Sequence, residues 1–225
     1  MMKFNYIFGL FLLLFTTTCF ALEQNEKLWL GINTQKSFSE ESPWLYLISS
    51  ELRFIHKNYP WQTAYLEGGL GRKILFNTRI WFGYRWSGHK PYHQFYQENR
   101  LFQQFIWPIH PNESVSFVSR SRLEEIMRAN QSQIALQLRE RISFEMKYRF
   151  VRRINPYFYD ELFFRLNRTN YTSNSLLREN RLFLGINFHL STTQFLEIGY
   201  INQYQSQTPL KQNQINHILS FIYNF

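Results

Sequence analysis

Acidic and basic side chains recur at two-residue spacing along this 225-residue sequence. In an extended chain, residues such as Glu98 and Arg100, or Arg139 and Arg141, therefore point to the same face. Carboxylates and guanidiniums arranged in this way can pair with one another or bind a charged ligand. The charges with this placement are Glu98, Arg100, Arg120, Arg122, Glu124, Arg139, Arg141, Glu145, Glu161, Arg165, Glu179 and Arg181.

Two interpretations of these charges differ in what they imply. If the stretches are neighbouring strands, arginine and glutamate side chains can form a ladder that fills a small lumen and satisfies itself. This structural role is the favoured interpretation. The alternative is a lumen that binds a ligand or selects anions, and the sequence leaves both open.

Residues that could support catalysis or hold a metal are scattered. His89 and His93 have the spacing of a ligand pair, but residues 87–91 are typical of a turn rather than a helix. No Gly-x-Ser-x-Gly motif occurs, and Ser119 and Ser121 have no histidine nearby in the sequence. We therefore predict no catalytic, metal or cofactor site. A lipid-modifying hydrolase, with a serine and a histidine on barrel strands, is the alternative.

The first 21 residues predict a cleaved secretory signal peptide. Lys3 supplies the positive start, residues 7–15 the apolar run, and Cys19-Phe20-Ala21 the cleavage site. Because the sequence has a single cysteine, the mature chain would have no disulfide and no cysteine metal site. The net charge of +9 could suggest that the protein binds nucleic acid. The predicted signal peptide and the lack of long basic runs argue against that partner.

The composition combines many aromatic rings with many polar groups. Aromatic residues make up 19% of the chain, yet its mean hydropathy is −0.37. No segment after the signal has eighteen consecutive apolar residues, which excludes a membrane-spanning helix. Strands with one face in lipid and the other in a polar lumen have this mixed composition.

The clearest strand signal is an alternation across residues 135–150. One face carries Arg139, Arg141 and Glu145, and the opposite face is apolar except for Glu140. Period two sorts these charges, whereas helical spacing would scatter them. Comparable or weaker alternation occurs in residues 28–34, 44–54, 61–71, 79–86, 98–106, 116–127, 157–167, 181–190, 196–203 and 216–225.

These stretches predict an all-β fold: a closed up-and-down antiparallel transmembrane β-barrel of roughly 10–12 strands, formed by residues 22–225. Eleven stretches can be counted, but bacterial single-chain barrels have even numbers, with both ends in the periplasm. We favour twelve strands, with a turn hidden in one long stretch. Ten would result if the stretch near Trp29 did not cross. A soluble periplasmic β protein is the remaining alternative.

The last strand resembles the terminal strand of bacterial outer-membrane barrels, which the barrel assembly machinery recognises. Leu219, Phe221, Tyr223 and Phe225 alternate toward one face and end in an aromatic residue. We expect these four side chains to face lipid, to act as an assembly signal, and to lie on a strand paired with the first. Counting back from Phe225 makes the long stretches 205–214 and 167–178 extracellular and the short stretches 189–193 and 151–156 periplasmic.

Several stretches, taken in order, resemble family 2490 of the domains of unknown function. Those that carry the resemblance are residues 98–104, 119–125, 160–167, 179–185 and 196–204, together with Asn216-His217 and the final strand. The family consists of secreted proteins of Gram-negative bacteria taken to be outer-membrane barrels, and it usually has an acidic residue or histidine where Asn99 stands. The resemblance implies a fold and a location, but no activity, substrate or catalytic residue.

Together these patterns predict a monomeric protein of the cell outer membrane. Its expected partners are outer-membrane lipid, lipopolysaccharide and the barrel assembly machinery, with no nucleic acid. The expected role is structural, or that of a narrow pore for small anionic solutes.

Overall fold

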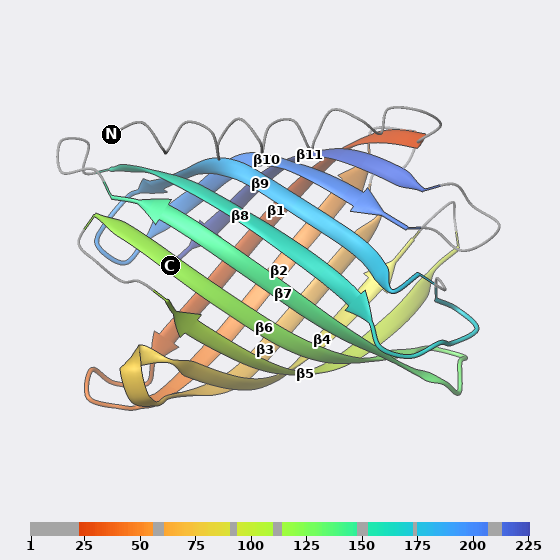
Figure 1. The fold of residues 1–225 in the computed structure, drawn as a ribbon, viewed down its shortest axis with the longest axis horizontal. Helices are drawn as coiled ribbons and strands as arrows, with labels where there is room; N and C mark the ends of the chain where they lie inside the picture. The colour runs from red at the N-terminus through yellow and green to blue at the C-terminus, as the bar shows by residue number, and fades with distance from the viewer. Residues whose placement is uncertain are drawn as a thin grey trace, which may run out of the picture.

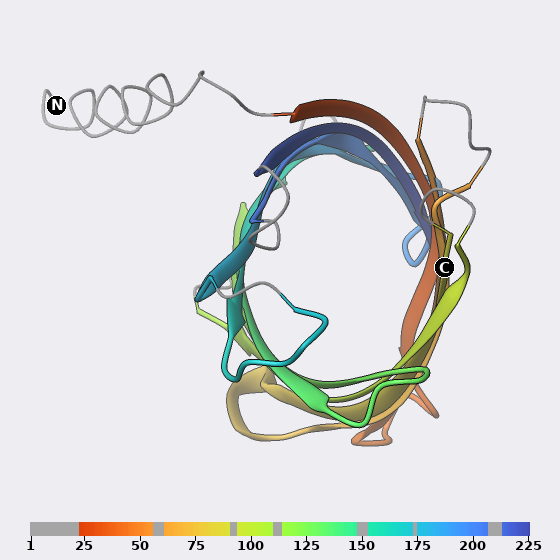
Figure 2. The same cartoon turned by 90° about the vertical axis from the view of Figure 1, so that its right-hand side faces the viewer.

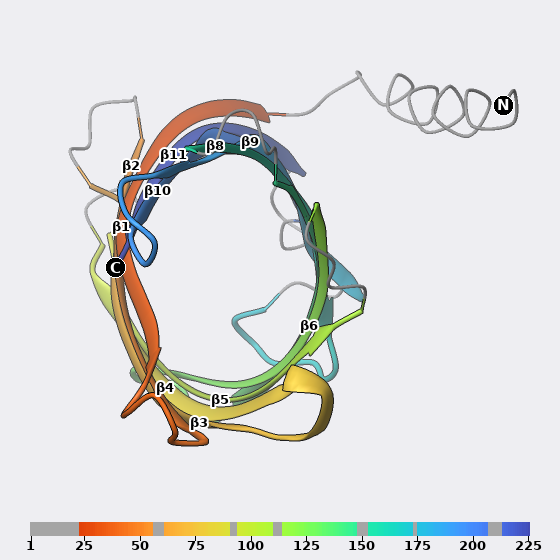
Figure 3. The ribbon, with the colours of Figure 1, turned by 90° about the vertical axis from the view of Figure 1, so that its left-hand side faces the viewer.

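The structure is a computed structural model that describes residues 23–55, 61–90, 94–109, 114–147, 153–172, 175–206 and 213–225. These residues form one sheet that closes into a barrel of tilted strands (Figure 1). Seen along its axis, the wall is an oval ring (Figure 2, Figure 3). Helix in the described part of the chain is limited to one 3-10 turn, η1 (Leu75–Asn77). No described helix is long and apolar enough to cross a membrane.

Each strand pairs antiparallel with its neighbours in the sequence, and β1 and β11 close the ring by pairing in parallel. The parallel register runs from Glu23 opposite Gln214 to Asn33 opposite Asn224. The strands are β1 (Glu23–Ser37), β2 (Trp44–Ile55), β3 (Thr63–Lys73), β4 (Arg79–His89), β5 (Tyr96–Pro108), β6 (Val115–Arg128), β7 (Ile134–Met146), β8 (Ile154–Arg165), β9 (Leu177–His189), β10 (Phe195–Gln205) and β11 (Gln214–Asn224).

The closed all-β barrel is as predicted, but two details were wrong. The described residues form eleven strands instead of the favoured twelve, and the ladder that closes the ring is parallel instead of antiparallel. The stretch around Trp29 belongs to the full-length strand β1, and none of the described strands hides a turn. An odd number can close because a parallel ladder also satisfies the backbone groups of both edge strands. As a result, β1 begins at the end of the barrel opposite to that where β11 ends.

We call the opening where β11 ends the C-terminal mouth and the opening where β1 begins the N-terminal mouth. The described connections 38–43, 74–78 and 190–194 lie at the C-terminal mouth, and 129–133 and 166–172 lie at the N-terminal mouth. The segment that follows β8, drawn in teal to cyan, reaches across part of the N-terminal mouth (Figure 2). The Tyr171 hydroxyl holds it there, because it accepts a hydrogen bond from Ala135 N–H (3.2 Å) and donates to the Ile126 carbonyl (2.9 Å). Burial raises the pKa of Tyr171 above its ordinary value.

The barrel wall is apolar outside and largely polar inside. Leu66, Leu70, Phe82, Leu184 and Leu219 are each more than half exposed on the outer face. Glu124, Glu161 and Asn216, by contrast, are completely buried. The alternation read from the sequence thus has its apolar face outward.

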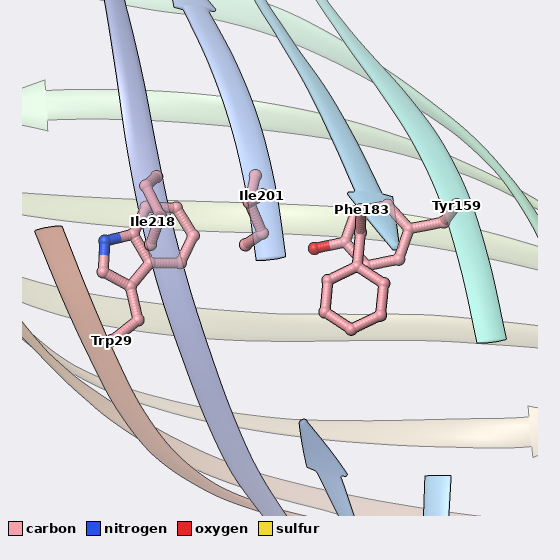
Figure 4. Packing of buried hydrophobic residues seen from close by; sticks show 5 residues of the cluster. All are labelled: Trp29, Tyr159, Phe183, Ile201 and Ile218. Atoms are coloured by element: carbon pink, nitrogen blue, oxygen red, sulfur yellow. The ribbon is translucent and has the colours of Figure 1, made fainter. Parts of the chain in front are cut away.

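Two aromatic clusters are the exception to the polar interior. The first joins Trp29, Tyr159, Phe183, Ile201 and Ile218, from β1, β8, β9, β10 and β11 (Figure 4). The second joins Leu45, Leu47, Trp81, Phe102 and Ile106.

Glycines allow the rings of these clusters to lie against the inner wall. Gly185 and Gly199 are directly opposite each other on β9 and β10, beneath the ring of Phe183. A Cβ atom on Gly199 would lie 2.3 Å from Phe183 Cζ, and one on Gly83 would lie 2.2 Å from Phe102 Cζ. Any larger residue at these positions would displace the ring.

Candidate functional site

The lumen is the candidate site, because the structure places the charges singled out in the sequence there. Glu98, Arg100, Arg122, Glu124, Arg139, Glu161, Arg165, Glu179 and Arg181 are buried, and Arg120, Arg141 and Glu145 line a lumenal cavity. Most of them join a connected network of ion pairs, which we call the lumenal network.

Glu161 on β8 is one centre of the lumenal network. Its carboxylate contacts Arg120, and it accepts hydrogen bonds from Arg139 (2.8 Å) and Arg141 (3.0 Å). The guanidinium of Arg181 lies 4.0 Å away. One completely buried carboxylate therefore faces four guanidinium groups.

Glu124 on β6 is the second centre. It is 3.0 Å from Arg100, 2.9 Å from Arg122 and 2.7 Å from Arg139. Because Arg139 contacts both Glu124 and Glu161, it joins the two centres into a single network.

Glu67 extends the network to the other side of the lumen. It lies on β3 and contacts Arg85 on β4 (2.5 Å) and Arg122 on β6 (2.6 Å). Glu67 and Arg85 were missing from the sequence-based set, as were Glu51 and Arg53, which pair at 2.5 Å. The signal that could have revealed them is the same two-residue alternation in the weaker stretches of β2, β3 and β4.

Some predicted members lie outside the network. Glu145 contacts Asn155 (2.9 Å) and Asn187 (3.1 Å) instead of the neighbouring arginines on β7. Arg165 has no carboxylate within salt-bridge distance in the described part of the chain, and its Nη1 has no hydrogen-bond partner there. Glu179, by contrast, joins the network through Arg181, with which it pairs at 2.5 Å, and it also accepts a hydrogen bond from Gln203.

Arginines and aromatic rings alternate around the lumen, in an arrangement that we call the arginine–aromatic belt. The indole of Trp29 contacts the guanidiniums of both Arg53 (3.9 Å) and Arg181 (4.9 Å). Each such contact stabilises the pair by about 0.5–2 kcal/mol and holds the guanidinium plane in place. The belt runs through Arg139, Phe163, Arg181, Trp29, Arg53, Tyr65 and Arg85.

Four cavities follow one another through the barrel. From the C-terminal mouth inward they have volumes of about 620 and 160 Å³, and we call them the outer and inner C-terminal cavities. The inner and outer N-terminal cavities, of about 190 and 250 Å³, continue to the N-terminal mouth. Adjacent cavities share lining residues, so they form one series.

Arginines stand at every boundary in this series. Arg120 and Arg141 line both C-terminal cavities, and Arg128 and Arg178 line both N-terminal cavities. The boundary between the two inner cavities is formed by belt residues: Trp29, Arg53, Tyr65, Arg85, Arg139 and Arg181. A solute that moved along the lumen would therefore pass a positive group at each narrowing.

Buried hydrogen-bond donors of the lumen also lack acceptors within the described residues. They include Nε of Arg100, Arg120 and Arg141, and Nε1 of Trp29. The buried acceptors that lack a donor among the described residues are Asn187 Oδ1, Asn216 Oδ1 and Ser220 Oγ. Proteins satisfy such groups with water or with a ligand, and the charged donors favour an anionic one.

The described histidines form no serine–histidine pair. His89 contacts Thr63 (3.1 Å) and Glu98 (3.5 Å) inside the barrel. On the outer face, His217 Nδ1 is 2.5 Å from the Tyr200 hydroxyl. His93 lies outside the described residues, as do His56, His110 and the predicted signal peptide. Among the described residues no group of three or more His, Cys, Asp or Glu could hold a metal ion.

Of the predicted assembly residues, Leu219, Phe221 and Tyr223 lie on β11, and Phe225 directly follows it. Leu219 is 56% exposed, and the ring of Tyr223 stacks on that of Phe225 with centroids 5.7 Å apart. The backbone N–H of Phe225 donates to the Asn33 carbonyl of β1 (3.2 Å), and Phe221 is the register partner of Leu30. These residues therefore belong to the seam that closes the barrel.

Fold and lumen together define a class: a closed β-barrel with an apolar outer wall and a charged interior. Residues 26–214 match the family model described as "Protein of unknown function (DUF2490)", and the chain belongs to that family. An uncharacterized protein of Methylorubrum extorquens is 29% identical over 124 residues, which cover 55% of this chain and 54% of that protein. The chain thus spans about half the length of this curated relative. No solved structure matches the chain.

Proposed function

We propose that this protein is a bacterial outer-membrane barrel. The apolar outer wall supports the proposal, because so large an exposed apolar surface is unusual in a soluble monomer and matches the lipid-facing band of membrane barrels. Trp44 and Trp107, at the C-terminal mouth, are each at least half exposed, and Trp61 and Trp86 lie near the N-terminal mouth. Rings at both ends are typical of interfacial girdles.

The remaining cellular assignments follow from this proposal. Residues 1–21 direct export, and the assembly machinery inserts the barrel as a monomer among outer-membrane lipid and lipopolysaccharide. With the C-terminal mouth in the periplasm, the N-terminal mouth and its described connections 129–133 and 166–172 face outward. Heat-modifiable migration and fractionation with outer membranes are the expected results, whereas recovery in the soluble periplasmic fraction would contradict the proposal.

Within the membrane, the barrel acts as a narrow pathway for small anions. The observation that carries this function is the series of four cavities along the lumen, in which each cavity shares arginines with the next. Rings of basic side chains select anions in pores because they offset the cost of removing the ion from water. Inner cavities of about 160 and 190 Å³ restrict the pathway to small solutes.

Single-channel recording in planar bilayers tests this function. We expect small unitary currents and, in a salt gradient, a reversal potential displaced toward that of chloride. An Arg53→Gln variant, which removes one belt charge, should shift the reversal potential toward zero, and Arg72→Gln, on the exposed outer side, should not. Folded wild-type protein that gave no current at any voltage would overturn the pore.

A further inference from the structure

Arg120 and Arg141 are directly opposite each other on the neighbouring strands β6 and β7. Like charges in this position repel each other and destabilise a sheet. A second like-charged pair, Arg122 opposite Arg139, follows immediately. The wall of the inner C-terminal cavity therefore carries four guanidinium groups on two adjacent strands.

Glu67 and Glu124 pair with Arg122 and Arg139, which leaves Glu161 as the main ion-pair partner of Arg120 and Arg141. One of its carboxylate oxygens contacts Arg120 and the other accepts a hydrogen bond from Arg141 Nη2 (3.0 Å), while Arg139 also binds it at 2.8 Å. The Nε atoms of Arg120 and Arg141 are buried, and neither has an acceptor among the described residues. The Arg120 and Arg141 side chains nevertheless remain 18% and 21% exposed, so part of each faces the cavities that they line.

Aromatic packing holds the Arg141 guanidinium in place. It lies 4.0 Å from the centre of the Tyr159 ring, which stacks on Phe183 at 4.8 Å and 5°. Tyr159 and Phe183 belong, with Trp29, to the first buried cluster (Figure 4). A fixed guanidinium loses little conformational entropy when it binds a ligand.

Arg120 and Arg141 stand where the inner cavity, of about 160 Å³, opens into the outer C-terminal cavity of about 620 Å³. One water-sized sphere occupies roughly 10–15 Å³. The inner cavity therefore has room for a solute of several heavy atoms. Glu197 also lines this boundary. A solute can enter from the wide mouth and meet both guanidinium groups.

We propose that Arg120 and Arg141 form a binding site for a phosphate-type oxyanion at this boundary. A guanidinium presents parallel N–H donors that match two oxygens of one anion, and two opposed guanidiniums match a tetrahedral oxyanion better than a halide. This inference deepens the proposed anion pathway and rests on it for its biological role. Glu161 is the positioning residue that holds the two arginines side by side.

Equilibrium binding of radiolabelled inorganic phosphate to refolded full-length protein in detergent tests the site without requiring a current. We expect saturable binding that excess chloride displaces poorly. Arg120→Gln and Arg141→Gln should each weaken binding by about tenfold or more, as expected for a lost charge-assisted hydrogen bond. The matched control is Arg79→Gln, which lines the outer C-terminal cavity away from the boundary and should bind as the wild type does.

Heat-modifiable migration verifies that each variant is folded. If a glutamine variant does not fold, Arg120→Lys and Arg141→Lys retain the charge without the paired donors, and weaker binding is again expected. Absence of phosphate binding by the wild type, or equal binding by folded boundary variants, would overturn the site. Phosphate binding that depends on both arginines in a protein without current would support the site and overturn the pore.

Discussion

Arg122 on β6 donates two hydrogen bonds, of 3.0 and 2.6 Å, to the carboxylate of Glu67 on β3. Two strands, β4 and β5, separate these residues in the sheet, so the contact bridges the lumen instead of following the wall. Its geometry is that of a two-point ion pair between largely buried groups. The bridge links two sides of the lumen, and it limits how wide the pathway can be.

Replacing Glu67 with glutamine should lower stability. Arg85 and Arg122 would then lose a carboxylate that lies 2.5 and 2.6 Å from them. Breaking one partner of a buried ion pair costs roughly 3 kcal/mol, which denaturant unfolding of the refolded protein can measure. The control is Glu26→Gln on the exposed side of β1, with an expected change within about 0.5 kcal/mol. Equal effects of the two variants would mean that the bridge contributes no stability.

Gly199→Ala should impair folding, since the new methyl group would lie 2.3 Å from Phe183 Cζ and 2.6 Å from the Leu184 carbonyl. Overpacking of this kind typically costs about 1–3 kcal/mol. Gly68→Ala is the matched control, because its Cβ would have its nearest neighbour at 3.9 Å. The yield of heat-modifiable barrel should fall for Gly199→Ala and remain unchanged for Gly68→Ala. If both variants fold equally well, the flat placement of the Phe183 ring is not required.

Trp29→Ala should enlarge the pathway. The indole contacts both Arg53 and Arg181 and lines both inner cavities, so its removal joins the two cavities and frees both guanidiniums. We expect a larger single-channel conductance than that of the wild type. Trp44→Ala, which removes an exposed ring from the outer wall, should leave conductance as it is. An unchanged current through folded Trp29→Ala protein would place the narrowest point elsewhere.

Deletion of Phe225 should reduce the amount of folded protein in the outer membrane. The residue closes the seam through its N–H bond to Asn33, and its ring stacks on Tyr223. Refolding in detergent, where no assembly machinery acts, should be less affected than assembly in cells. Leu75→Ala, at an exposed apolar position near the same mouth, provides the comparison and should assemble at wild-type levels. Unchanged levels after the deletion would show that the final residue is not an assembly signal.

A disulfide can test the parallel closure. Leu28 on β1 is the register partner of Leu219 on β11, and neighbouring strands are about 4.8 Å apart, within disulfide range. Leu28→Cys with Leu219→Cys should therefore cross-link on oxidation, which a gel mobility shift detects. The pair Leu28→Cys with Tyr223→Cys is displaced by four residues along β11 and should remain reduced. Cross-linking of the displaced pair alone would mean that the register differs.

Period-two alternation allowed much of the fold to be predicted. In β7 the alternation placed Arg139 and Arg141 on one face and Ile142 on the other. In the structure the two arginines line the lumen, and Ile142 is 48% exposed on the outer face. The prediction of closure came from the expected membrane setting, in which lipid could not satisfy an open sheet edge. Alternation carries no information about how many strands close the ring, and the assumption of an even number led to twelve where eleven close through a parallel seam.

The sequence could not predict which charged side chains pair with one another. Arg139 was expected to pair along neighbouring strands, and it does contact Glu161 on β8, but Glu67 reaches Arg122 across two intervening strands. Such pairs depend on the stagger of the strands around the ring, which is set by all the pairings together.

The sequence by itself determined the type of each element, the face on which each side chain lies, and the family to which the chain belongs. The tertiary structure decided the strand number, the seam between β1 and β11, and the opposition of Arg120 and Arg141. The physical reason is that side-chain direction follows from local backbone geometry, whereas closure and contacts across the lumen follow from the registers of the whole sheet.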